Sequence, residues 1–453
     1  YANDQGDKVM RPTYLKNARE TCLIPVGAES NKEVQVLSAF MATLPVIEGW
    51  LTASFGNSLP IRVGKQTKIK CFTEVEFNDP AFKDCRPDGL IIVSTGRSEW
   101  SALVEAKIKH GKLEQPQIER YAQAAKQYGI DSLITISNEM ASRPDHHPIA
   151  FPKTLTNTVA LLHYSWASIL TNAQILEGQT AVDDPEQSFI LRELIKYLGH
   201  DSSGIYRFDQ MSSAWNEIVK QAVGLLSFAK SSEEVAQIAS DWIQESKDLS
   251  MRLSSLVNER VEVKHSKAAK ADMAVLRKEI VESLANNNTL ETELDVPNSA
   301  GGIKVSANLQ TRQVSVSMQI TAPKDKKSTS ARVNWLLRML KHEESDNLVI
   351  GATWPSRIEN THSTVSQLRT APDSIQCNNP KVAPVNFTVN LIVDNIKAFN
   401  GRKTFINLLE ESVELFYTIA GQHIKAWQAS PPKAKSSAAI EVDETTKDQV
   451  IDV

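Results

Sequence analysis

The first third of the chain has apolar runs of two periods, which predict helices and strands. From 33 to about 55 the apolar residues recur at near-helical intervals, and Ser30 and Glu33 have the spacing of a capping box. We expect one helix there, bent near Pro45. The next segments predict strands at 68–77, 90–93 and 100–108, a helix at 115–128 that stops at Gly129, strands at 132–137 and 159–162, and a helix through 175. This order predicts a mixed sheet flanked by helices.

In the remainder of the chain the pattern predicts helices first, and then strands in which apolar and polar residues alternate. Residues 186–290 carry an amphipathic stripe that includes Val235, Ile238 and Trp242. Core packing explains this stripe best, and a dimeric coiled coil is the alternative. Turn formers at 297–302 end the helical pattern, and a hairpin at 303–309 and 314–320 follows. A helix at 331–341, strands at 348–353 and 387–393 and a helix at 404–427 complete a predicted α+β domain.

A chain of 453 residues exceeds what one hydrophobic core usually serves, so several domains are expected. The pattern divides it into an N-terminal arm (1–27), a mixed α/β domain (28–180), a helical region (181–298), an α+β domain (299–428) and a disordered acidic tail (429–453). The helical region or the α+β domain could also mediate homo-oligomer formation.

Composition excludes several classes of protein. Hydrophobic residues make up 41% and charged residues 23%, as in globular proteins with a packed core. The net charge of −4 provides no global attraction to nucleic acid or to an anionic membrane, so any phosphate-binding surface must be local. No segment reaches the length of a membrane span, and no Walker loop, GxSxG elbow or GxGxxG segment is present.

The four cysteines show neither a CxxC pair nor a zinc-ligand spacing: Cys22, Cys71, Cys85 and Cys377. Reduced thiols in a cytoplasmic protein are the expected state, and Cys71 is expected to be a small buried apolar residue. Two other sites could suggest metal or catalysis, but His146 and His147 are expected in a polar loop, and His163 as a satisfied, partly buried side chain.

Three residues suggest chemistry. Asp88 directly precedes the apolar run 90–93, and Glu105 and Lys107 are two apart in the next predicted strand, so their side chains share one face. A hairpin would bring Asp88 to them. Two carboxylates suit a hard cation such as Mg²⁺, which can activate water for phosphodiester cleavage, and a lysine can orient that water. The alternative is a solvated ion pair on a strand face.

These residues resemble a known family. Pro87-Asp88 followed by Glu105-Ala106-Lys107 resembles the PD-(D/E)XK nuclease superfamily, and the resemblance spans about residues 28–180. It implies a restriction-endonuclease-like core that binds Mg²⁺, with Mn²⁺ as a substitute, through Asp88, Glu105 and the Ala106 carbonyl. The family's first-helix acid corresponds to Glu33, and the rival acids are Glu48, Glu74 and Glu76.

A second motif follows on the next helix. Gln117 and Tyr121 fit the Gln-xxx-Tyr pattern that the exonuclease-like branch of this superfamily carries after its ExK strand. Residues at i and i+4 lie on one helix face, so both are expected to support the active site. A local basic edge formed by Arg97, Lys109, Lys112 and Arg120 would bind phosphates without reading bases.

We therefore expect a metal-dependent nuclease that hydrolyses DNA, with a role in defence against phage or in DNA repair. The metal chemistry alone does not choose between DNA and RNA. The alternative is an assembly or nucleic-acid-binding protein that keeps the fold without cleaving.

Overall fold

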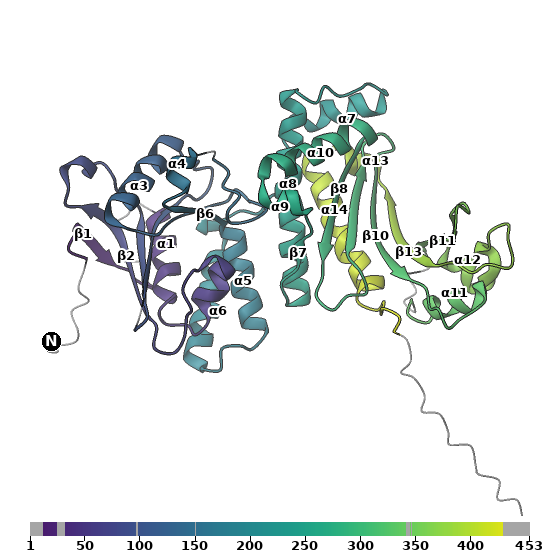
Figure 1. Cartoon of the computed structure of the whole chain (residues 1–453), viewed down its shortest axis with the longest axis horizontal. Coiled ribbons are helices and arrows are strands. Elements are labelled where there is room, and N and C mark those ends of the chain that lie inside the picture. Colours follow the sequence, from purple (N-terminus) through teal and green to yellow (C-terminus); the bar gives the residue numbers. More distant parts are fainter. Residues whose placement is uncertain are drawn as a thin grey trace, which may run out of the picture.

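A computed structural model describes residues 12–24, 32–96, 98–149, 151–340, 345 and 347–428. The predictions for Ser30 and Arg97 and for the tail 429–453 lie outside these residues. The described chain forms two sheets, each covered by helices, and Figure 1 shows them side by side along the long axis. The expected mixed α/β architecture is confirmed at this level.

The first sheet has six strands in sequence order from β1 to β6. Strands β1 to β4 pair antiparallel, whereas β4, β5 and β6 run parallel, so the sheet is mixed as predicted. Its strands are β1 (Leu15–Glu20), β2 (Lys68–Phe77), β3 (Gly89–Ser94), β4 (Glu99–Ala106), β5 (Ser132–Ser137) and β6 (Ala160–Ser165).

Helices cover both faces of this sheet, because successive strand residues point to opposite sides. On one face, Ile91, Val93 and Val104 pack with α1 (Lys32–Thr43), α2 (Trp50–Phe55), α5 (Trp166–Gly178) and α6 (Pro185–Gly199). On the other, Leu90, Ile92 and Leu103 pack with α3 (Gln115–Tyr128), and α4 (Lys153–Thr156) adjoins α3. Asp88 and Glu105, which lie next to these buried residues in the sequence, are therefore held by a sheet that is packed on both faces.

Two predictions in this region were wrong. The segment expected as an aperiodic arm contains β1, which pairs with the edge of β2 at Leu15↔Phe77 and Glu20↔Phe72. Most β1 side chains are at least partly exposed, so the strand lacks the apolar alternation that would have predicted it. The single helix expected from 33 to 55 is two helices, because the chain between Thr43 and Trp50 turns.

The second sheet is antiparallel, in the order β12-β11-β13-β10-β9-β8-β7. The predicted hairpin is confirmed as β9 (Ile303–Asn308) and β10 (Gln313–Thr321). The other strands are β7 (Glu262–Val263), β8 (Thr289–Asp295), β11 (Val349–Thr353), β12 (Thr361–Thr364) and β13 (Asn386–Asp394). The helices of this half are α7 (Trp215–Val223), α8 (Glu233–Val257), α9 (Lys267–Ala271), α10 (Met273–Asn287), α11 (Thr329–Leu337), α12 (Val365–Thr370), α13 (Ile396–Asn400) and α14 (Arg402–Phe416).

The structure does not contain a separate helical domain at 181–298, because its helices pack into two different cores. Leu191, Leu194 and Leu198 of α6 belong to the core of the first sheet. One core cluster then extends from Met211 to Ile424 and joins α8 to the second sheet. The stripe on α8 is thus buried within the chain, as favoured over a coiled coil, and β7 and β8 fall inside the segment expected to be helical.

Two further observations concern the apolar character of the helices and the state of the cysteines. No helix among the described residues combines the length and apolar character needed to cross a bilayer. All four cysteines are free thiols, and Cys71 is buried as expected.

Candidate active site

The end of β4 brings the three predicted chemical residues together. The Asp88 carboxylate accepts a hydrogen bond from the Ala106 backbone N–H at 2.9 Å, which ties the start of β3 to the end of β4. Glu105 is on β4 itself, with only 1% of its side chain exposed, and Lys107 follows the strand by one residue. The hairpin thus places the residues where the sequence predicted.

The Lys107 ammonium is surrounded by oxygens. Its Nζ lies 2.6 Å from Glu105 Oε1, 3.0 Å from Glu33 Oε1 and 3.0 Å from the Ala106 carbonyl oxygen. The second oxygen of Glu33 accepts from the Ile108 N–H at 3.0 Å. Three of the four predicted metal-binding residues therefore converge on one point, and a cationic group lies there.

Glu33 is thereby distinguished from its three rivals. It is on α1 and reaches the end of β4 across the sheet face. Glu74 and Glu76 instead form ion pairs with Arg19 and Arg86, at 2.8 and 3.3 Å. Glu48 is exposed in the turn before α2.

The acids of this cluster outnumber its cations. Burial and the adjacent Asp88 carboxylate raise the pKa of Glu105 to about 8, although the attraction of Lys107 opposes both. Burial also raises the pKa of Asp88, while the Ala106 N–H and Lys107 lower it. The pKa of Lys107 is raised despite burial, because Glu105, Asp88 and Glu33 surround its ammonium. One amine cannot neutralise three carboxylates, so the site favours either a bound proton or a further cation.

Gln117 and Tyr121 lie beside the cluster on one face of α3. The Gln117 amide donates to Glu105 Oε1 at 3.0 Å and to the Tyr121 hydroxyl at 2.9 Å. The Tyr121 hydroxyl donates in turn to the Arg86 carbonyl oxygen at 2.9 Å, just before Pro87 and Asp88. The i and i+4 spacing thus links the helix to Glu105 and to the backbone that leads into Asp88.

One residue at this site was missed by sequence reasoning. Trp166, the first residue of α5, is buried, and its indole N–H donates to the Lys107 carbonyl oxygen at 3.0 Å. It fixes the backbone that carries the lysine. Nothing in the local sequence indicates this, because the two residues are 59 positions apart.

The predicted basic edge lies close by. Lys109 and Lys112 are exposed in the loop after β4, and Arg120 is exposed on α3. Lys109 has a positive φ of 55°, and its N–H donates to the Gly204 carbonyl oxygen at 2.7 Å. These side chains are free to meet an approaching polyanion, and their nucleic-acid role stays a prediction.

The histidines set aside on sequence grounds have structural partners. The Thr135 hydroxyl lies 2.8 Å from His163 Nδ1 and 2.9 Å from His147 Nε2. Burial lowers the pKa of His147 to about 3 and that of His163 to about 4. The satisfied role expected for His163 is confirmed. His146 is 5% exposed and contacts Ser142, so the expected polar loop is more buried than predicted.

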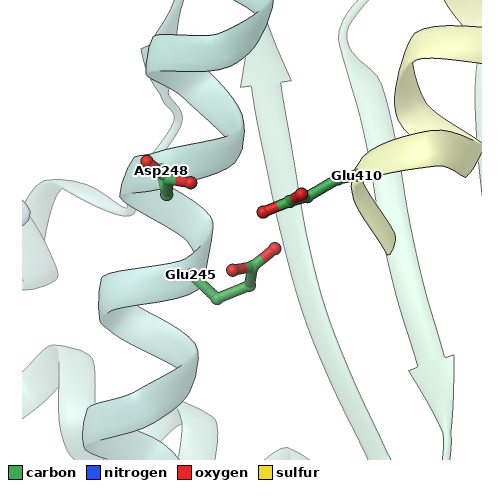
Figure 2. A group of neighbouring side chains, drawn as sticks. All are labelled: Glu245, Asp248 and Glu410. Carbon is green, nitrogen blue, oxygen red and sulfur yellow. The ribbon is translucent and has the colours of Figure 1, made fainter. Parts of the chain in front are cut away.

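Among the described residues, the acids whose ligand atoms all lie within 4.8 Å of one another are a different group: Glu245, Asp248 and Glu410. Figure 2 shows Glu245 and Asp248 on α8, with Glu410 reaching them from α14. Two arginines already serve this group: Arg207 and Arg252 lie 3.0 and 2.7 Å from the Asp248 oxygens, and Arg252 lies 2.8 Å from Glu410.

The third acid of that group, Glu245, is best explained as a protonated, uncharged carboxyl group. Both of its oxygens are buried without a hydrogen-bond partner among the described residues, and burial followed by Asp248 raises its pKa well above the usual value. A protonated Glu245 leaves two carboxylates for two arginines. We interpret the group as an ion-pair network that joins α8 to α14.

Comparison of the chain with protein-family models, curated proteins and solved structures gives no match. The geometry of the cluster at the end of β4 therefore carries the functional argument.

Proposed function

We propose that this protein is a Mg²⁺-dependent nuclease with a restriction-endonuclease-like core. The observation that supports this most is the convergence of Asp88, Glu105 and Lys107 at one strand end, with Gln117 and Tyr121 bonded to the same cluster. A strand-face ion pair would be worth little energetically and would need neither the second acid nor the helix. DNA is the substrate that we propose, for defence against phage or for repair.

The donor set fits a hard divalent cation. Glu105 Oε2 is buried without a hydrogen-bond partner among the described residues, and carboxylate and carbonyl oxygens are the ligands that Mg²⁺ prefers. Asp88, Glu105 and the Ala106 carbonyl would hold the ion, with Glu33 beside them. When bound, the ion would neutralise phosphate charge and make a bound water more acidic.

The protein's own residues have separate tasks in this proposal. When a cation binds, the Lys107 ammonium would move away from the Glu105 and Glu33 carboxylates. It would then orient the attacking water or stabilise the charge that develops on the phosphate. Gln117 would keep Glu105 in one rotamer, and Tyr121 would connect Gln117 to the Arg86 backbone. Lys109, Lys112 and Arg120 would attract the phosphate backbone.

The test is cleavage of plasmid, linear duplex DNA, single-stranded DNA and RNA with Mg²⁺, Mn²⁺ or EDTA. The wild type is compared with Asp88→Asn and Lys107→Ala. We expect Mg²⁺-dependent products from DNA, lost with EDTA and reduced by about 100-fold or more in both variants, the size found when a group that stabilises transition-state charge is removed. Lys83→Ala removes an exposed lysine outside the cluster and serves as the matched control.

Two results would overturn the proposal. The first is DNA retention on a gel without metal-dependent products, which would support a binding or assembly protein. The second is cleavage that survives in both site variants, which would place the activity elsewhere or in a contaminant.

A further inference from the structure

A second feature of the molecule lies where the two halves meet. Two cavities, of about 560 and 220 Å³, share the residues Ser142, Lys247, Val263 and His265. The larger also borders β6 and the loop that follows β5, whereas α8 and β7 come from the second half. These sizes suit a small molecule rather than a polymer.

The larger cavity has more cations than anions in its wall. Arg143, Lys247, Arg260 and Lys270 line it, against Asp145 and Glu262. Arg143 and Asp145 neutralise one another, at 2.8 Å from Nε to Oδ1. The remaining three cations therefore face Glu262 alone, which leaves the wall with a net positive charge.

Two groups in the shared wall lack a partner. Among the described residues, the half-buried Lys247 ammonium forms no hydrogen bond or ion pair. The Nε2 atom of His265 is buried and likewise has no hydrogen-bond partner there. A buried polar atom without a partner is costly, so His265 indicates a missing ligand, and the half-buried Lys247 ammonium beside it is available to bind one.

The electrostatic environment supports an anion. Burial lowers the pKa of Lys247, and the neighbouring Arg260 lowers it further, with Glu262 opposing. Burial, followed by His146, Lys247 and Lys270, lowers the pKa of His265 to about 4. In both cases nearby cations disfavour the protonated form, which an anion between them would restore.

We propose that this interdomain cavity binds a small phosphate-bearing anion, held by Lys247, Arg260, Lys270 and His265. The Ser165 hydroxyl in the same wall accepts from the Ser168 N–H and would donate its proton to an oxygen of the anion. Apolar neighbours such as Leu162 and Met251 leave room for an organic group attached to the phosphate, as in a nucleotide. This site is separate from the proposed nuclease cluster and does not depend on it.

The test measures the thermal midpoint and the affinity for sodium pyrophosphate in EDTA, with sodium chloride at matched ionic strength as the reference. We expect pyrophosphate to raise the midpoint of the wild type beyond the chloride reference. Lys247→Met should unfold at a higher temperature than the wild type in chloride, because it removes a half-buried cation that burial and the nearby Arg260 disfavour. It should also lose at least ten-fold in pyrophosphate affinity. A lysine with only a structural role would not combine these two effects.

Three further variants secure the interpretation. Lys270→Met changes an exposed residue, so it should fold normally and weaken pyrophosphate binding even if Lys247→Met does not fold. Lys220→Met, an exposed lysine on α7, should bind as the wild type does. Glu105→Gln should also bind pyrophosphate normally, which separates this proposal from the nuclease. Equal midpoint shifts in the wild type and Lys270→Met, or no shift beyond chloride, would overturn it.

Discussion

Replacing Glu105 by glutamine distinguishes a catalytic acid from a structural ion pair. Glutamine has the same shape, keeps an oxygen for the Lys107 ammonium and carries no charge. If the pair served stability, the substitution would destabilise the protein at every pH. In the crowded cluster described above, we expect the opposite.

The size of the effect follows from the pKa shift. Burial and Asp88 raise the pKa of Glu105 from 4.5 to about 8, so the folded protein holds a proton that the unfolded chain releases above pH 4.5. Stability therefore falls as pH rises from 4.5 toward 8. Over the 2.5 pH units up to pH 7, at about 1.36 kcal/mol per unit, the cost is about 3 kcal/mol.

Glu105→Gln removes this cost, and the weaker bond from Lys107 to an amide oxygen offsets part of the gain. We expect the variant to be more stable than the wild type by about 1 to 3 kcal/mol at pH 7 without metal. The difference should be small at pH 5 and largest near pH 8. The same variant should have no Mg²⁺-dependent cleavage, since strained sites often exchange stability for activity.

The assay is urea unfolding of both proteins in EDTA at pH 5, 6, 7 and 8, followed by fluorescence of the buried tryptophans. Equal slopes of unfolding free energy against urea in the two proteins would show that the comparison is valid. A variant that is less stable than the wild type by the same amount at every pH would refute the reasoning. Glu105 would then be a structural partner of Lys107.

Two other predictions concern Tyr121, beside the cluster, and the buried His163. Tyr121→Phe removes the hydroxyl that joins Gln117 to the Arg86 carbonyl. We expect the free energy of unfolding in urea to fall by about 1 to 2 kcal/mol and the cleavage rate to fall roughly ten-fold. Unchanged stability would contradict the hydrogen bonds described. His163 is held neutral by burial, with a pKa near 4, so its contribution to stability is present above pH 6.5 and is lost as pH falls from 6.5 toward 4. Between pH 6.5 and pH 4, the free energy of unfolding of His163→Gln should therefore fall by up to about 3 kcal/mol less than that of the wild type. Parallel plots of unfolding free energy against pH for the two proteins would reject this cause.

Local pattern was sufficient for the segments that carry the chemistry. The helix 115–128 and the strand 132–137 were predicted with the bounds that the structure has, because Pro116, Gly129 and the apolar run mark both elements. The placement of Glu105 and Lys107 two residues apart at the end of one strand, and of Gln117 and Tyr121 on one helix face, follows from backbone periodicity.

Long-range contact decided what the pattern could not. The edge strand β1 exists because β2 offers it free hydrogen-bonding groups, and its own exposed face carries no signal. The role of Trp166, and the choice of Glu33 among four acids, depend on side chains that meet across the sheet. The cavity around Lys247 and His265 exists only where two separately patterned halves come into contact. Sequence by itself determined which residues share an element, and tertiary structure determined which elements share a site, because periodicity acts over a few residues whereas burial and charge act through space.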